Sequence, residues 1–532
     1  MVQLDCLLVH TPKFDNYYKP IGHFTWVNYM PVGMLGLADH LETGGCRARI
    51  LHQGVEWMND RSWRLEDTLA TVDAPLVALS LHWHQQAYDV IETCRRIRAV
   101  RPQAYIALGG FTASFFHDEL VRDYDCVDGV ICGDAEVPLL ELTLRLKAGT
   151  RELGDVPNLT WRNARGEVVQ NGVSYCGTAE MLDRLCFSNM ELLCNYRAYV
   201  DYVTFPFVVV KHISKESNFR RVGIGRKLFP LTLGRGCPLN CTWCAGSFES
   251  QKKISCRDRV ARRSHDAVLA DVRRAIDYGY EAMYSVFDPT PQPQGQDYFV
   301  ELFRRLREEG LAKKVGWMHE ATGLACGEFI DAFAETVAED FRVLAVSPES
   351  GNEEVRRRNK GYFYSNDQLH EMLDHAVRRG IQAEVFFSCG IPGENEESLR
   401  DTIRLRDEIQ RRHGRKVRVR TMSIEMEPGA PWHVEPEKHG IVTSLKAFRD
   451  FYTAHSRSGA SSYTGLGYYV PDYFKAPLDA GDPEADFARR LQQLKCKHFC
   501  LIHPRPFWGR MLCRTLRTVR LLARRDRRHS PD

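Results

Sequence analysis

The sequence lacks a strong excess of charge of either sign. It has 72 Lys and Arg residues against 69 Asp and Glu residues, so the formal net charge is only +3 over 532 residues. Proteins that bind nucleic acid through a general basic field need a larger excess, and we expect no nucleic-acid partner. The hydrophobic fraction of 44% and the charged fraction of 27% are those of an ordinary globular protein, which argues against disorder or a fibrous architecture.

Long apolar runs and a secretory leader are also missing. No stretch approaches the roughly 20 apolar residues that span a bilayer, so no transmembrane segment is expected. The first ten residues have neither the basic start nor the small-residue cleavage site of a signal peptide, and we expect a cytoplasmic protein. Its 17 cysteines are an odd number, and in a reducing compartment thiols fill the core or bind metal instead of pairing.

No internal repeat or low-complexity segment is found, and 532 residues are too many for one hydrophobic core. Residues 1–150 alternate short apolar runs with amphipathic helical patterns. The predicted strands are Leu4 to Val9, Arg47 to His52, Leu76 to Leu81, Tyr105 to Leu108 and Gly129 to Cys132. Helical patterns between the strands make the repeated unit βαβ, which predicts a doubly wound, Rossmann-like α/β domain with a parallel sheet.

Residues 151–225 are predicted to be a connector, and residues 226–440 resume the alternation of strands and helices with a different spacing. The six strands predicted there are Leu231 to Leu233, Ala282 to Phe287, Val315 to Met318, Val343 to Val346, Ala383 to Phe387 and Val417 to Ile424. Six parallel strands separated by helices form a partial, TIM-like (β/α)6 barrel, whose chemistry gathers at the carboxyl ends of the strands.

Residues 441–532 are predicted to be a mainly helical C-terminal region with a basic tail. Between Trp508 and Arg528 many arginines are interspersed with leucines. This pattern is typical of an amphipathic helix that makes peripheral contact with a membrane or an acidic partner. It is equally typical of a terminal helix that packs its leucines on the body of the protein, and the sequence leaves both interpretations open.

Three cysteines, Cys237, Cys241 and Cys244, share the short segment from Gly234 to Gly246 with the spacing C-x3-C-x2-C. Three thiolates on one loop bind a single soft metal centre, as iron–sulfur clusters require. A structural zinc site normally has four ligands, so the triplet favours a cluster with one open iron. A zinc site or a chance triplet remains the alternative.

This segment, with Trp243 just before the third cysteine, resembles the signature of the radical S-adenosylmethionine (radical SAM) superfamily. The resemblance implies a 4Fe-4S cluster on the three cysteines, which are then both metal ligands and catalytic residues. It also implies that S-adenosylmethionine chelates the open iron and is cleaved reductively to a 5'-deoxyadenosyl radical. An electron donor such as flavodoxin or ferredoxin is an implied partner.

Motifs further along the chain are similar to cofactor-binding motifs of the same superfamily. Ser347 to Gly351 resembles a Glu-Ser-Gly motif and Gly390 to Glu394 a glycine-proline motif. The resemblance implies the following contacts with S-adenosylmethionine: Glu349 and Ser350 with its ribose and methionine parts, Gly390 and Pro392 with its adenine, Lys360 with its carboxylate and Asp288 with its amino group. Trp243 is counted among the cofactor-binding residues.

The front domain resembles the cobalamin-dependent branch of the superfamily over the segments Pro31 to Gly36, Leu79 to His84 and Leu108 to Thr112. In a doubly wound sheet the ligand lies beyond the carboxyl ends of the strands. The resemblance implies corrin contacts from Ser80, His82, Gly109, Gly110 and Thr112. The Asp-x-His-x-x-Gly motif is absent, so cobalamin is expected without an axial histidine from the protein. Hydrogen bonds between His82 and nearby loops are the alternative.

The resemblance implies a cobalamin-dependent methyltransferase that acts on an unactivated carbon of a small molecule or peptide. Radical cyclisation, rearrangement or hydroxylation is the enzymatic alternative, and a non-catalytic cobalamin or iron–sulfur sensor is the other. Four residues at strand ends are expected to face the barrel cavity as substrate-contacting or proton-transferring groups: His319, Glu320, Glu425 and Glu427. The sequence does not identify the substrate.

Overall fold

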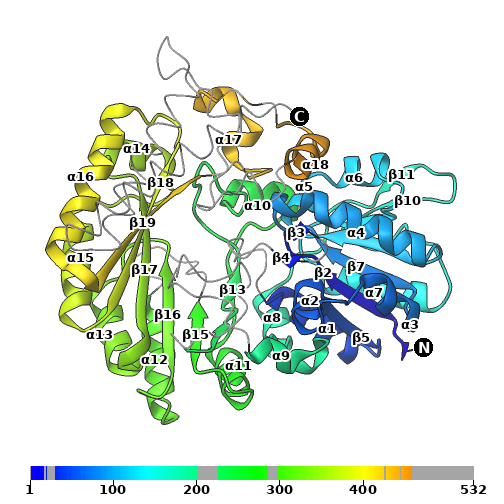
Figure 1. Ribbon diagram of the computed structural model, residues 1–532, viewed down its shortest axis with the longest axis horizontal. Helices are drawn as coiled ribbons and strands as arrows, with labels where there is room; N and C mark the ends of the chain where they lie inside the picture. Colours follow the sequence, from blue (N-terminus) through cyan, green and yellow to red (C-terminus); the bar gives the residue numbers. More distant parts are fainter. Residues whose placement is uncertain are drawn as a thin grey trace, which may run out of the picture.

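The computed structural model describes residues 2–457 except 17–18, 21–29, 202–225, 286–295, 425–426, 442 and 444. Two α/β bodies lie side by side, the front domain in blue and cyan and the barrel in green and yellow (Figure 1). The predicted basic tail lies outside the described residues. None of the helices among the described residues is long and apolar enough to cross a membrane.

A seven-stranded sheet forms the centre of the front domain, in the order β11-β10-β9-β8-β7-β2-β5. Its five parallel strands confirm the five that the sequence predicts: β2 (Cys6–His10), β5 (Ala48–His52), β7 (Leu76–Ser80), β8 (Tyr105–Gly109) and β9 (Gly129–Ile131). Two antiparallel strands from the predicted connector extend this sheet: β10 (Leu159–Arg162) and β11 (Val168–Gln170). The doubly wound prediction is confirmed.

Helices cover both faces of this sheet, so its central strands are apolar on both sides. In β2, Cys6 and Leu8 contribute to one hydrophobic cluster, and Leu7 and Val9 to a second one on the opposite face. The helices of the domain are α1 (Val32–Thr43), α2 (Gln53–Asn59), α3 (Leu65–Thr71), α4 (Ala87–Val100), α5 (Phe111–Phe115), α6 (His117–Asp123) and α7 (Glu136–Lys147). Strand order reverses between β2 and β7, which is where such folds bind ligands.

Six parallel strands form the barrel sheet in sequential order. They are β12 (Leu228–Pro230), β15 (Ala282–Ser285), β16 (Gly316–Ala321), β17 (Arg342–Glu349), β18 (Gln382–Cys389) and β19 (Val417–Ser423). The helices outside them are α11 (His265–Asp277), α12 (Asp297–Glu308), α13 (Gly327–Thr336), α14 (Glu353–Asn359), α15 (Asn366–Arg378) and α16 (Glu396–His413). The partial-barrel prediction is confirmed.

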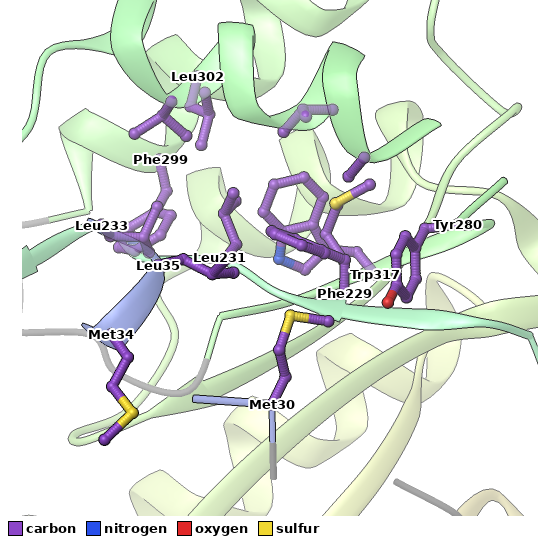
Figure 2. Packing of buried hydrophobic residues seen from close by; sticks show 14 of the residues in the cluster. Met30, Met34, Leu35, Phe229, Leu231, Leu233, Tyr280, Phe299, Leu302 and Trp317 are labelled. Atoms are coloured by element: carbon purple, nitrogen blue, oxygen red, sulfur yellow. The ribbon is translucent and has the colours of Figure 1, made fainter. Parts of the chain in front are cut away.

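The first barrel strand lies three residues earlier than predicted. Leu231 and Leu233 are buried but follow β12, and they join the hydrophobic cluster that also contains Leu35 of α1. Figure 2 shows Leu35 beside Leu231 and Leu233, with Trp317 of the barrel in the same cluster. Packing against the front domain therefore explains why the apolar run continues beyond β12, and one continuous core joins the two bodies.

Shorter elements lie at the junction of the two bodies. Strands β13 (Gly234–Arg235) and β14 (Ala261–Arg262) form a small antiparallel sheet around α10 (Phe248–Ser255). Near the C-terminal end of the described chain, α17 (Pro431–Val434) lies above the barrel and α18 (Phe448–Arg457) lies beside α4 (Figure 1).

Candidate cluster and cofactor site

The three cysteines of the motif lie on the loop between β13 and α10. Gly236, with φ of +98°, turns the chain into this loop, and a Cβ there would meet the carbonyl oxygen of Arg259 at 2.7 Å. Only glycine fits such a turn without strain. Further along, Cys244 N–H donates to Cys241 O over 3.2 Å. The loop thus folds back on itself between the second and third cysteine.

The three thiols are half-buried. Burial, together with the neighbouring Cys241 and Cys237, raises the pKa of Cys244 to about 12. Deprotonation of such a cluster of sulfurs is unfavourable unless a cation is present, and metal ligation supplies that cation. The backbone N–H of Gly361 donates to the sulfur of Cys241 over 3.3 Å. These sulfurs have the donor chemistry of an iron–sulfur site.

Among the described residues, no three His, Cys, Asp or Glu side chains are close enough together to hold a single metal ion. The cysteines of a cubane cluster bind different irons and stand further apart than the ligands of one ion. The observation that favours a cluster over the zinc alternative is the three-cysteine spacing of the sequence.

Asn359, the last residue of α14, joins the cysteine loop to the glycine-proline motif. Its backbone carbonyl accepts from Thr242 N–H over 2.9 Å, and Thr242 Oγ1 donates to its Oδ1 over 3.0 Å. Its Nδ2 donates to the carbonyl of Pro392 over 2.8 Å. One buried amide therefore fixes both loops at the same end of the barrel.

Two positive-φ glycines, Gly390 and Gly393, shape the glycine-proline motif into a tight turn. Glu394 closes the turn, because its carboxylate accepts from Gly390 N–H over 2.7 Å. Burial raises the pKa of Glu394 to about 7, although backbone N–H groups of Gly390 and Ile391 act to lower it. The motif is thus a rigid turn beside the cysteine loop, where the sequence predicts an adenine contact.

Glu349 is the member of the Glu-Ser-Gly motif that faces the barrel interior. A register shift between β17 and β18 precedes it, and its own φ is +65°. Such bulges and left-handed residues occur next to functional sites. Its carboxylate lies 3.8 Å from Lys360 Nζ and accepts a short hydrogen bond from Ser388. Burial raises its pKa, whereas Lys360 and Ser388 act to lower it.

Ser350 has a different environment from Glu349. It is fully buried, its Oγ lies 3.3 Å from Thr402 Oγ1 of α16, and it accepts from Asn352 N–H over 3.1 Å. The guanidinium of Arg356 donates to its backbone carbonyl over 2.7 Å. These contacts shape the start of α14, so the structure gives Ser350 a scaffolding position.

Glu320 and Tyr284 lie on the inner face of neighbouring strands. Tyr284 OH donates to Glu320 Oε2 over 2.7 Å, while burial and the nearby Glu349 raise the pKa of Glu320. The prediction that His319 faces the cavity is wrong. It lies one residue before Glu320, so it points to the outer face, where it packs between Phe299 and Phe329. Asp288 and Glu425 lie outside the described residues.

The predicted corrin-binding edge of the front domain is formed by the ends of β7 and β8. Ser80 and Gly109 pair across these strands, and a Cβ on Gly109 would meet, among the described residues, a single carbonyl oxygen at 3.7 Å, so these residues leave room beside it. Gly110 has φ of +103° and packs against the backbone of His82. Small residues of this kind let a flat ring approach the strand ends.

His82 and Thr112 have structural contacts at this edge. Thr112 Oγ1 is buried and donates to the carbonyl of His82 over 3.0 Å. The half-buried ring of His82 packs against Trp83 and Phe111, and burial lowers its pKa to about 4. Ser80, Gly109 and Gly110 are therefore better placed than Thr112 to line a corrin site.

His84 is buried away from this edge. Its Nδ1 lies 2.9 Å from Nε2 of His455 in α18, and its Nε2 lies 3.8 Å from Glu427 Oε1. Burial lowers its pKa to about 3. Glu427 thus contacts a front-domain histidine, and its charge also raises the pKa of Cys244.

Several residues that shape the site belong to none of the motifs found in the sequence. Asn359 and Gly361 contact the predicted motifs, Tyr284 contacts Glu320, and Arg257 forms an ion pair with Asp134. Their partners lie far away along the chain, so no local spacing revealed them. The one signal available in the sequence was the glycine that follows Lys360, since a glycine can mark a close backbone approach. The structure shows such an approach, because a Cβ at Gly361 would meet Asn240 N at 2.6 Å. Asp134 itself lies in the stretch from Gly133 to Glu136, which the parallel-sheet pattern indicates as a ligand-facing strand end.

The fold and site define a class of two-domain α/β protein in which a doubly wound domain faces a three-cysteine loop on a partial barrel. The Radical SAM superfamily model matches residues 231–406, and the B12 binding domain model matches residues 27–143. The chain therefore belongs to the radical SAM proteins that carry a B12-binding domain.

Curated relatives cover parts of the chain. An uncharacterized methyltransferase of Pyrococcus horikoshii is 21% identical over 329 residues, which are 60% of this chain and 61% of the relative. The tRNA-2-methylthio-N(6)-dimethylallyladenosine synthase of Geobacter sulfurreducens is 28% identical over 186 residues, 34% of this chain and 40% of the relative. The chain thus spans less than two thirds of either relative.

Two solved structures share the fold over most of the chain. The radical S-adenosylmethionine methyltransferase TsrM from Kitasatospora setae, with cobalamin and a 4Fe-4S cluster bound, has a TM-score of 0.64 and 16% identity, and covers 95% of this chain and 90% of its own. The cobalamin-dependent radical enzyme OxsB has a TM-score of 0.53 and 13% identity, and covers 93% of this chain and 61% of its own. At these identities the likeness shows the fold.

Proposed function

We propose that this chain is a cobalamin-dependent radical SAM methyltransferase that acts on an unactivated carbon. The observation that supports this proposal most directly is a contact between the front domain and the segment before the cysteine loop. Asp134 follows β9 at the carboxyl edge of the front sheet, and its Oδ1 lies 3.0 Å from Nη1 of Arg235, two residues before Cys237. The edge suited to a corrin therefore adjoins the loop suited to the cluster.

When bound, the cluster supplies an electron to the sulfonium of S-adenosylmethionine and cobalamin supplies a transferable methyl group. Cys237, Cys241 and Cys244 would hold the cluster, and Gly361 N–H stabilises negative charge on Cys241. Glu349 and Lys360 would orient the amino acid part of S-adenosylmethionine. Ser80, Gly109 and Gly110 would line the corrin face. An electron donor such as flavodoxin or ferredoxin is part of the proposal, since reductive cleavage consumes an electron.

The inner face of the barrel would hold the substrate and exclude water from it. This inner face includes an apolar layer, in which Met318, Val343 and Ala345 pack together. Glu320, hydrogen-bonded to Tyr284, lies above this layer and has a raised pKa. A carboxyl group of this kind is suited to hold a proton near the substrate.

The test uses anaerobically purified protein with a reconstituted cluster, added cobalamin, S-adenosylmethionine and a chemical reductant. The proposal predicts both 5'-deoxyadenosine and S-adenosylhomocysteine as products. A variant with Cys237, Cys241 and Cys244 all changed to alanine serves as control and should give neither. Formation of 5'-deoxyadenosine alone would favour radical cyclisation, rearrangement or hydroxylation and would contradict methyl transfer. The absence of both products from the native sequence would favour a sensor.

A further inference from the structure

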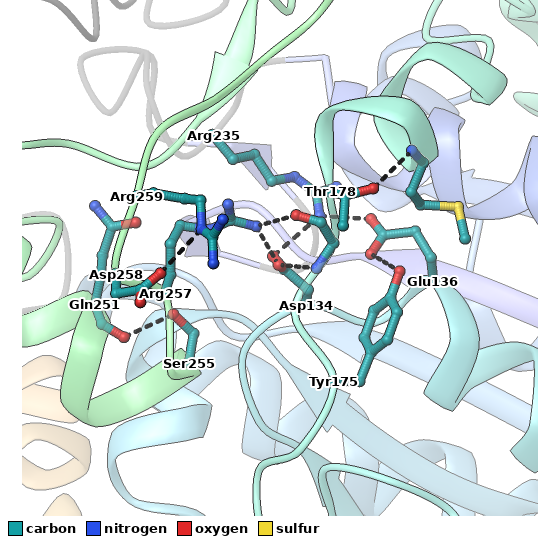
Figure 3. Close-up of polar contacts among 12 residues, drawn as sticks. Asp134, Glu136, Tyr175, Thr178, Arg235, Gln251, Ser255, Arg257, Asp258 and Arg259 are labelled. Atoms are coloured by element: carbon teal, nitrogen blue, oxygen red, sulfur yellow. Dashed lines mark hydrogen bonds and ion pairs between the residues drawn. The ribbon is translucent and has the colours of Figure 1, made fainter.

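Four charged side chains, three buried and one half-buried, connect the front sheet to the segment that enters the cysteine loop (Figure 3). The carboxylates are Asp134 and Glu136, and the guanidinium groups are Arg235 and Arg257. We call this set the interdomain ion cluster. Its members come from the end of β9, the start of α7, β13 and the segment after α10.

Arg235 contacts both carboxylates. Its Nη1 lies 3.0 Å from Asp134 Oδ1 and 2.5 Å from Glu136 Oε1. Arg257 Nη2 donates to Asp134 Oδ2 and, over 2.9 Å, to the carbonyl of Gly177. Burial acts to raise the pKa of Asp134, but Arg235 and Arg257 lower it overall. The cluster thus contains two negative and two positive groups, so its net charge is zero. An unpaired charge at such a site would destabilise the folded protein.

The surrounding backbone leaves little room for this junction to move. A Cβ on Gly133 would meet Cα of Ser255 at 2.9 Å, and a Cβ on Gly429 would meet Cδ1 of Ile254 at 2.9 Å. Gly177 N–H donates to Asp134 Oδ2 over 2.8 Å. The front domain is therefore in direct contact with α10 beside the ion cluster.

We propose that the interdomain ion cluster is a positioning device that fixes the distance between the corrin-binding edge and the iron–sulfur loop. This inference rests on the proposed function. Arg235 is separated from the first cysteine only by Gly236, whose positive φ leaves no alternative turn. Asp134 belongs to the same carboxyl edge as Gly109, because β8 and β9 pair in parallel. A movement at the Arg235 contacts therefore changes the separation of the two cofactor sites directly.

The main variant combines Glu136→Gln with Arg235→Gln. Removal of one carboxylate and one guanidinium leaves Asp134 paired with Arg257, so no buried charge loses its counterion and the protein should still fold. Arg235→Lys keeps the charge but replaces the guanidinium, whose Nη1 contacts both carboxylates, by a compact ammonium group on a flexible stem. The comparison variant is Asp271→Asn, which breaks the more deeply buried Arg263–Asp271 pair of 2.7 Å in the barrel part of the chain.

The readout is the electron paramagnetic resonance of cob(II)alamin in protein with a reduced cluster. A nearby paramagnetic cluster speeds the spin relaxation of cobalt, so the microwave power at half saturation reports their separation without any substrate. We expect enhanced relaxation in the native sequence, loss of the enhancement in the double variant and an intermediate value in Arg235→Lys. Retained enhancement in the double variant, or equal loss in Asp271→Asn, would overturn the positioning role.

Hydrogen exchange of the cofactor-free protein separates this inference from the proposed function. If the native sequence binds no cobalamin, the proposed function fails, while the ion cluster is still testable. The double variant should then exchange faster in both 133–136 and 236–246, and Asp271→Asn should not. Unchanged exchange in these two segments would overturn the inference.

Discussion

The backbone N–H of Gly361 donates a hydrogen bond of 3.3 Å to the sulfur of Cys241. This contact links the end of α14 to the cysteine loop, and there is no space for a side chain at the glycine. A Cβ would meet Asn240 N at 2.6 Å and Cβ of Leu239 at 2.8 Å. The loop that carries the cysteines is thus held by backbone packing from a segment more than a hundred residues further along the chain.

Gly361→Ala should displace the cysteine loop and lower cluster content. The clash involves backbone, so relief requires a shift of the loop, which costs about 1–3 kcal/mol. Iron and sulfide per chain after anaerobic reconstitution, together with visible absorption, measure the effect. Gly154→Ala is the control, because nothing lies within 4 Å of a Cβ there. Equal cluster content in both variants would show that the packing at Gly361 is unimportant.

Asn359→Ala should uncouple the cysteine loop from the glycine-proline turn. The substitution leaves the hydroxyl of Thr242 and the carbonyl of Pro392 without their amide partner. Unsatisfied buried groups of this kind cost about 1–3 kcal/mol of unfolding free energy. Urea denaturation measures the loss, and S-adenosylmethionine should also bind more weakly. Asn359→Asp keeps an acceptor for the Thr242 hydroxyl but loses the donor to Pro392, so its stability should be intermediate. If Asn359→Ala were as stable as the native sequence, this would contradict the bridging role of Asn359.

Glu349→Gln should weaken S-adenosylmethionine binding and leave the cluster in place. The carboxylate lies beside Lys360 and Ser388 on the inner face, and loss of a charge-assisted contact corresponds to about tenfold or more in affinity. Calorimetry with reconstituted protein gives the dissociation constant. Glu354→Gln, on the exposed side of α14, is the matched control. Unchanged affinity in Glu349→Gln would exclude Glu349 from the binding site.

Glu394 should make stability depend on pH. Burial raises its pKa in the folded protein to about 7, against about 4.3 in an unfolded chain. The folded state therefore binds the proton more tightly. The stability from this group is present below about pH 4 and is lost as pH rises through 7, by up to roughly 4 kcal/mol. Glu394→Gln should flatten the change in unfolding free energy between pH 5 and 7.5, and an unchanged slope would contradict the raised pKa.

The sequence predicted the architecture well because the central strands of both sheets are parallel and buried. Their strands are apolar runs separated by amphipathic helices, and this pattern is local. The first barrel strand was misplaced because Leu231 and Leu233 are buried against α1 of the front domain. An apolar run does not reveal which surface buries it.

Prediction of the site was uneven for a similar reason. The cysteine triplet has a fixed spacing on one loop, so the sequence revealed it. His319 and Glu320 are adjacent in one strand and must point to opposite faces, and the sequence did not indicate which one faces inward. The bulge before Glu349, the Asn359 bridge and the interdomain ion cluster depend on contacts between distant segments. Tertiary packing alone determines them.

The most direct test of the account is electron–nuclear double resonance of the reduced cluster with S-adenosylmethionine labelled with 15N at its amino group. Three cysteine ligands leave one iron open, so the account predicts a resolved 15N hyperfine coupling that disappears with unlabelled cofactor. No coupling in protein with a complete 4Fe-4S cluster would mean that every iron is already fully ligated, and it would contradict the account.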